Sequence, residues 1–276
     1  MPKVTKIRKP VKKSAPSPAT SILGKARPVK IEHNGIKLVV YGRSKTGKTR
    51  LASTFKKPLL MIGTEYGVRS LGNVASMDFL KIESIDDYDE IVAALPTSKY
   101  ASVAVDTGGG IQDLVMKDVL GLDEIPLQRS WGIAEQRDWA TIAVQTKERF
   151  RNLLNLAQFN KINVIIVAHE RNFGDETSTE LLAPTVGAAL TPSVCGWLNG
   201  ECDYIAQAFI RTKTIRKQTT IAGKKTEMSV PTDQSEYCLR IGPHAIYTTG
   251  FRVSPGVVLP DVIVDPTYDK LVKLMG

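Results

Sequence analysis

Residues 42–49 combine two glycines with a lysine and a threonine in the pattern G-x-x-x-x-G-K-T. Glycines at these positions let the backbone curl so that its N–H groups point at a bound phosphate. Lys48 then reaches the β- and γ-phosphates of a nucleotide such as ATP, and the Thr49 hydroxyl ligates Mg²⁺. The sequence therefore predicts a phosphate-binding loop formed by Gly42, Arg43, Ser44, Lys45, Thr46, Gly47, Lys48 and Thr49.

Two acidic residues and a histidine follow later apolar runs. Asp106 ends the run ASVAV, where a carboxylate can hold Mg²⁺ together with Thr49; capping the next helix is the alternative role. Glu65, just past PLLMIG, can deprotonate the water that attacks the γ-phosphate, unless it is only a surface glutamate. His169, after NVIIVA, can hydrogen-bond the γ-phosphate, although a lone histidine at a strand end needs no function. With Lys48, these residues are the catalytic candidates.

Short apolar runs that alternate with helical patterns must position these side chains. Continuous, β-branched runs are typical of strands buried on both faces of a sheet. The predicted strands are 36–41, 58–63, 101–105 and 163–168, and the predicted helices are 49–55, 84–95 with Ser84 as N-cap, and 141–158. This alternation predicts an α/β fold in which a mostly parallel twisted sheet is covered by helices on both faces.

The pattern changes after Cys202. Shorter strands are expected at 203–211, 226–230 and 236–241, with a polar basic stretch at 211–225 between them. We expect these segments to form a C-terminal antiparallel hairpin that completes the same sheet.

Charge divides the chain into two parts. Residues 1–31 contain nine basic side chains and no acidic one, whereas the remaining 28 basic and 28 acidic residues balance. The first 31 residues are also rich in Pro, Ser and Ala, so we expect a disordered basic tail before a core at 32–276. Such a tail is attracted to nucleic-acid phosphates, or it serves only as a solubilising leader.

Composition is that of an ordinary globular protein, with 42% hydrophobic and 24% charged residues. No run approaches the roughly 18 apolar residues that cross a bilayer, and the N-terminus has no apolar signal core. We therefore expect no membrane partner. The three cysteines form no CxxC pair, which favours reduced structural thiols in a cytoplasmic protein.

The order of these motifs resembles that of RecA-like P-loop ATPases. The chain is similar in particular to the phage "AAA domain" nucleotide-binding proteins, core-only RecA relatives that include single-strand annealing proteins. The similarity covers roughly Lys37 to Pro260 and is carried by TEYGVRSL, VAVDTGGG, IIVAHE and RVSPGVVLP. It implies a RecA-like fold, ATP and Mg²⁺ as cofactors, and a phage-infected bacterial host cytoplasm.

The resemblance also implies subunit contacts. RecA-like proteins place ATP at a head-to-tail boundary, so we expect a homo-oligomer, as a ring or a filament. Such ATPases often carry a Lys-x-Arg-like pair that reaches a neighbour's ATP, and here only Arg252 of TTGFR matches it. Arg252 is therefore a candidate trans-acting finger, with a solvated surface arginine as the alternative.

Single-stranded DNA is the partner that the resemblance implies. A single-strand-binding protein is a further candidate partner, which the sequence neither supports nor excludes. RecA-like proteins hold DNA in the loops after the third and fourth strands. Aromatic rings and cations that could contact bases and phosphates lie in or near those loops: Trp131, Trp139, Trp197, Arg129, Arg137 and Arg171. Buried core positions are the alternative for the tryptophans.

The leading interpretation is a DNA-dependent ATPase that acts in phage-type recombination or single-strand annealing. One alternative is a DNA-binding scaffold or loader that uses ATP as an assembly ligand without significant turnover. A small-molecule P-loop kinase is disfavoured, because no arginine-rich lid is evident and a basic tail has no use there.

Overall fold

A ten-stranded sheet, parallel through its centre, organises the part of the chain that the structure describes. The computed structural model describes residues 26, 34–122, 134–174, 185–221 and 224–275. The order along the sheet is β10-β8-β7-β1-β5-β4-β2-β3, with β6 paired to β5 and β9 to β7. Strands β1, β2, β3, β4 and β5 and the start of β7 run parallel, and β8 and β10 add an antiparallel edge.

The strands have the following bounds: β1 (Lys37–Gly42), β2 (Leu59–Gly63), β3 (Met77–Lys81), β4 (Ser102–Asp106), β5 (Asn163–Phe173), β6 (Thr185–Ala188), β7 (Tyr204–Ile221), β8 (Lys224–Arg240), β9 (Gly250–Phe251) and β10 (Val262–Val264). The helices are α1 (Lys48–Ser53), α2 (Ile85–Ala94), α3 (Gly108–Leu120), α4 (Gln136–Phe159), α5 (Pro192–Glu201) and α6 (Tyr268–Met275). Short 3₁₀ turns lie at η3 (Gly67–Leu71) and η4 (Leu95–Thr97).

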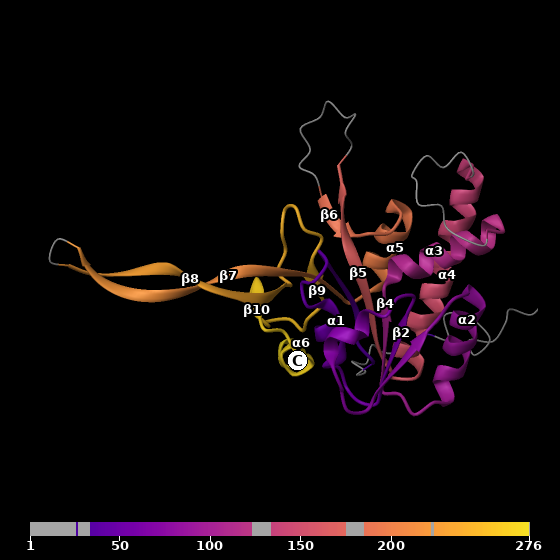
Figure 1. Ribbon diagram of the computed structural model, residues 1–276, viewed down its shortest axis with the longest axis horizontal. Coiled ribbons are helices and arrows are strands. Elements are labelled where there is room, and N and C mark those ends of the chain that lie inside the picture. Colours follow the sequence, from indigo (N-terminus) through magenta and orange to yellow (C-terminus); the bar gives the residue numbers. More distant parts are fainter. Residues whose placement is uncertain (1–25, 27–33, 123–133, 175–184, 222–223, 276) are drawn as a thin grey trace, which may run out of the picture. The chain divides into compact units, whose positions relative to one another are not determined.

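Helices cover both faces of the sheet, as the apolar strands predict (Figure 1). Successive side chains of β1 enter different cores, because side chains alternate across a strand. Val39 lies in the core formed with α2, α3, α4 and α5, whereas Leu38 lies in the core formed with α1 and α6. The predicted α/β fold with a mostly parallel sheet is confirmed.

The register of the central strands sets the place of the site. Gly42 at the end of β1 lies opposite His169 of β5, and Gly63 at the end of β2 lies opposite Asp106 at the end of β4. Parallel strands end at the same edge of a sheet, so the residues that follow them are brought together. The phosphate-binding loop, Glu65, Asp106 and His169 come from four such strands, whereas Arg252 does not.

Several predicted bounds are wrong in extent. Helix α4 begins at Gln136, not residue 141, because a capping box formed by Glu135 and Asp138 starts it earlier. Ser84 does cap α2, where its hydroxyl accepts from the Asp87 N–H at 3.1 Å. Elements β3, α3, β6, α5, β10 and α6 were not predicted from the sequence.

The C-terminal hairpin is longer than predicted. Two strands of 18 and 17 residues, β7 and β8, replace the three short strands and the polar stretch at 211–225. Beyond Thr212 and Ser235, the described residues of this hairpin pair only with each other, and Figure 1 shows the two strands extending as a long ribbon. In the described part of the chain no other element covers either face of this ribbon. Neither face is buried, so the sequence there lacks the alternation of apolar and polar residues by which a half-buried strand is predicted.

Candidate active site

The phosphate-binding loop joins β1 to α1 and is held tightly by its surroundings. A Cβ on Gly42 would lie 2.2 Å from the carbonyl oxygen of Ala208 on β7, so no larger residue fits there. Gly47 has a φ of +84°, a conformation that only glycine adopts without strain. These two glycines therefore fix the curl of the loop, as the motif predicts.

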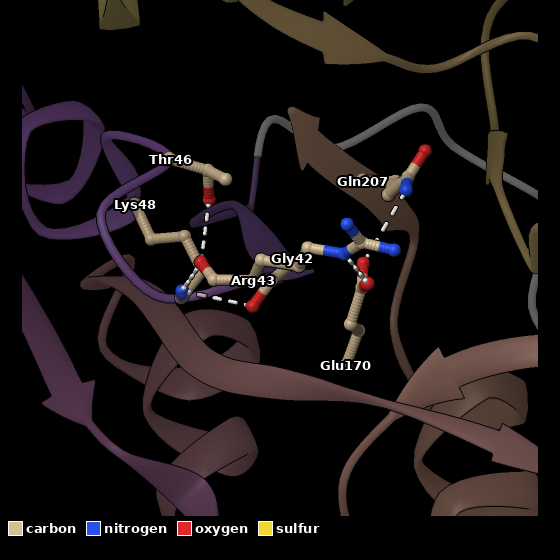
Figure 2. A network of polar contacts seen from close by, with 6 residues as sticks. All are labelled: Gly42, Arg43, Thr46, Lys48, Glu170 and Gln207. Atoms are coloured by element: carbon tan, nitrogen blue, oxygen red, sulfur yellow. Dashed lines mark hydrogen bonds and ion pairs between the residues drawn. The ribbon is translucent and has the colours of Figure 1, made fainter. Parts of the chain in front are cut away.

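Lys48 is buried inside this curl. Its ammonium donates to the carbonyl oxygens of Gly42 at 2.9 Å and Arg43 at 2.6 Å, and Thr46 Oγ1 donates to the same Arg43 oxygen at 2.9 Å (Figure 2). Burial lowers the pKa of Lys48, and the nearby carboxylates of Asp106 and Glu170 oppose that shift. A cation held by two carbonyl oxygens of the loop is well placed to receive phosphate oxygens.

Thr49 and Asp106 form the second contact that the sequence predicts. The Thr49 hydroxyl donates to Asp106 Oδ2 at 2.6 Å, so two hard oxygen ligands from α1 and β4 converge. Asp106 does not cap the next helix, because Thr107 does so by accepting from the Gly110 N–H at 3.2 Å. The pair fits Mg²⁺, which is usually held by one or two carboxylates, waters and the substrate's phosphates. The described residues contain no group of three or more His, Cys, Asp or Glu able to hold a metal alone.

A cleft of about 1030 Å³ brings the remaining candidates to the loop. Glu65, after β2, and His169, on β5, line this cleft together with Lys48, Thr49 and Asp106. Both Glu65 and His169 are exposed, so their side chains are accessible to a ligand. His169 does not end its strand, because β5 continues to Phe173 by pairing with β6.

An ion pair next to the loop was not predicted. Arg43 Nε donates to Glu170 Oε1 at 2.8 Å, and the hydrogen bond raises the pKa of Arg43. Gln207 on β7 lies 3.5 Å from the other Glu170 oxygen and accepts from Arg240 of β8 at 3.1 Å. Figure 2 shows Arg43 and Gln207 directed at Glu170 from different elements. Glu170 follows His169 directly, yet nothing in the sequence relates it to Arg43, 127 residues away.

Arg252 lies away from the cleft. It donates to Asp203 Oδ1 and to the Gly200 carbonyl oxygen, each at 2.9 Å. Asp203 immediately precedes β7, which runs parallel to β1, so Arg252 is near the sheet edge opposite the phosphate-binding loop. It does not contribute to the cleft of its own chain, and its proposed role in a neighbour's site stays a prediction.

The aromatic and basic residues considered for DNA contact have different surroundings. Trp139 is 37% exposed on α4, whereas Trp197 packs against the core beneath the guanidinium of Arg151. Arg137 pairs with Glu135 and Asp138, and Arg171 lies over the Phe173 ring. Trp131, Arg129 and the basic tail lie outside the described residues.

A strand, a phosphate-binding loop, a helix and an acidic residue ending a parallel strand define a P-loop nucleotide-binding protein. A family model described as an AAA domain matches residues 34–244, most of the chain, and the chain belongs to that family. A search of curated proteins finds no match. Among the helices that the structure describes, none has the length and apolar character needed to span a membrane.

Proposed function

We propose that this protein binds ATP with Mg²⁺ and hydrolyses it in the cleft beside the phosphate-binding loop. The observation that carries the proposal is the direct contact between Thr49 and Asp106 next to buried Lys48. That contact lies in the same cleft as the carboxylate of Glu65. A phosphate ligand, a metal ligand pair and a base are the parts that phosphoryl transfer to water requires.

Each of these residues has a separate task. Lys48 neutralises charge on the β- and γ-phosphates, Glu65 orients the attacking water and takes its proton, and His169 hydrogen-bonds the γ-phosphate. Thr49 and Asp106 would hold Mg²⁺, and the bound ion would offset the charge that develops on the phosphates.

Single-stranded DNA is the partner that we propose, in recombination or strand annealing in a phage-infected bacterial cytoplasm. The distribution of basic residues supports this partner. The tail carries nine of them without an acidic residue, and residues 211–236 of the hairpin carry six against three acidic ones. Phosphate backbones attract such segments independently of base sequence.

A homo-oligomeric ring or filament completes the proposal. Arg252 lies near the edge of the sheet opposite the cleft, which suits a head-to-tail contact in which one subunit's edge meets the next subunit's nucleotide. In that arrangement Arg252 leaves its ion pair with Asp203 and contacts the phosphates of the nucleotide bound by the neighbouring subunit.

ATP turnover by the full chain, measured with Mg²⁺ in the presence and absence of single-stranded DNA, tests this function. We expect turnover that DNA accelerates. Tight ATP binding without turnover would instead support the scaffold or loader. Turnover that DNA leaves unchanged would remove DNA as the partner, and phosphoryl transfer to an added small molecule would identify a kinase.

A further inference from the structure

A second, smaller pocket adjoins the cleft and shares Gly47, Arg50, Thr54 and Tyr237 with it. Its volume is about 110 Å³, which is comparable to the roughly 150 Å³ apolar cavity that admits benzene. Leu51 of α1 and Ala208 of β7, both buried, form an apolar part of its lining. The pocket therefore has the size of a site for a flat ring. Polar side chains of Thr46, Thr54, Asp265 and Thr267 complete its lining.

Tyr237 of β8 and Arg50 of α1 stand between this pocket and the cleft, since both residues line both spaces. The Arg50 guanidinium lies over the Tyr237 ring, 5.8 Å from its centroid. Close to the ring, a Cβ on Gly47 would lie 3.0 Å from Tyr237 Cδ1. An aromatic ring and a planar cation are thus held beside the start of α1, next to the residues that meet phosphate.

The segment that follows β10 closes the pocket. Asp265 and Pro266 line it, and the Asp265 N–H donates to the Tyr237 carbonyl oxygen at 2.8 Å. Lys270 fixes the same segment by donating to the carbonyl oxygen of Asp265 at 2.9 Å. Hydrogen bonds to the backbone therefore join the two walls of the pocket and make it a preorganised site.

We propose that this pocket receives the nucleobase of the nucleotide whose phosphates the loop binds. The inference rests on the proposed function, because it assumes a nucleoside triphosphate in the cleft. Arg50 directly follows Thr49, so the chain leads from the metal and phosphate ligands to the pocket within one residue. A base that enters the pocket would meet the Tyr237 ring, against which it can stack, and the apolar side chains of Leu51, Ala208 and Pro266 in the same lining.

The test compares two ligands, ATP and inorganic tripolyphosphate, on the full chain and on Tyr237→Ala. Tripolyphosphate reproduces the charge of the phosphates and has no base. We expect Tyr237→Ala to weaken ATP binding by about 5- to 150-fold, the range for removing one base–aromatic stack, and to leave tripolyphosphate binding unchanged. Tyr237→Phe keeps the ring and should retain ATP affinity.

Tyr100→Ala is the matched control. Tyr100 precedes β4, at the sheet edge opposite the cleft, where its hydroxyl donates to Asp78, and its removal should alter neither affinity. Thermal melting of each variant reports on folding.

The outcomes separate this inference from the proposed function. Unchanged ATP affinity in Tyr237→Ala would overturn the base pocket while leaving ATP binding intact. An equal fall in affinity for both ligands would also overturn it, because Tyr237 would then act only by packing against Gly47. If the unmodified chain binds neither ligand, the proposed function itself fails.

Discussion

Thr49 and Asp106 are joined by their own hydrogen bond beside buried Lys48, and this is what distinguishes the site from a chance motif match. Asp106 is 57 residues from Thr49 in the sequence. Its carboxylate meets the Thr49 hydroxyl at 2.6 Å only because β1 and β4 pair in register with β5, which lies between them. The side chains that handle phosphate and metal are therefore positioned by the fold.

Glu65 carries the catalytic prediction at this scale. Glu65→Gln should retain ATP binding and reduce turnover by about 10²–10⁴-fold, because an amide cannot take a proton from water. Steady-state turnover, together with a direct measurement of ATP affinity, checks both parts.

Glu83→Gln provides the control for Glu65→Gln, since Glu83 is an exposed glutamate paired with Lys81 away from the cleft. A fall in turnover of less than about tenfold, below the range for a general base, would exclude Glu65 from that role. Asp113, which also lines the cleft, would be the next carboxylate to test.

The sequence predicts this site unevenly. Lys48, Thr49 and Asp106 belong to local patterns, a loop motif and the end of an apolar strand, so they are accessible without a structure. Glu170 and Tyr237 are not, because their roles depend on β5 and β8 lying beside the loop. Tertiary pairing of that kind leaves no local signature.

At the scale of elements, the contacts of Glu170 tie the phosphate-binding loop to β5 and β7. Arg43 comes from the loop, Glu170 from β5 and Gln207 from β7, which in turn meets Arg240 of β8. The loop is thereby connected to the root of the long hairpin, and we expect this clamp to preorganise it for phosphate.

A double-mutant cycle tests the clamp. Arg43→Ala and Glu170→Ala should each weaken ATP binding by less than about tenfold, since a pair with one exposed partner contributes little. The double variant should bind ATP no more weakly than the single variant with the lower ATP affinity, because both changes remove the same ion pair. If the losses of ATP-binding free energy in the two single variants add fully in the double variant, Arg43 and Glu170 act independently.

The hairpin shows why some elements escape a sequence-based prediction. Apolar, β-branched runs identify β1, β2, β4 and β5 because those strands are buried. The outer part of β7 and β8 is stabilised by its own ladder and is rich in threonine and charge, and Pro231 within β8 argues against a strand. The fold of the core is thus predictable, whereas the length of its solvent-exposed extension is not.

At the scale of the whole molecule, the net positive charge lies in the first 31 residues of the sequence. The net charge of +9 equals the nine basic residues of the first 31, so the rest of the chain is neutral. Among residues 32–276, the segment 211–236 has three more basic than acidic residues. The other residues of that part have three more acidic than basic residues, so the two surpluses cancel. Nucleic acid is therefore expected to meet the tail and the hairpin first.

Deleting residues 1–30 should weaken single-stranded DNA binding and flatten its dependence on salt. For each phosphate that the shortened chain no longer neutralises, the log–log salt slope should fall by about 0.7, and the weakening should not depend on base sequence. ATP affinity should be unchanged, since β1 begins at Lys37. A salt slope that the deletion does not alter would assign the tail to solubility or to a protein partner.

ATP binding by Lys48→Ala tests the central claim most directly. In the full chain, isothermal titration with Mg²⁺ should show one ATP site, and Lys48→Ala should weaken it by at least about 30-fold, equivalent to about 2 kcal/mol for a charged partner removed from a buried site. The variant should melt as a folded protein, because Lys48 donates only to the loop's own carbonyl groups in the described structure. A folded Lys48→Ala variant with unchanged ATP affinity would contradict the assignment of the nucleotide site.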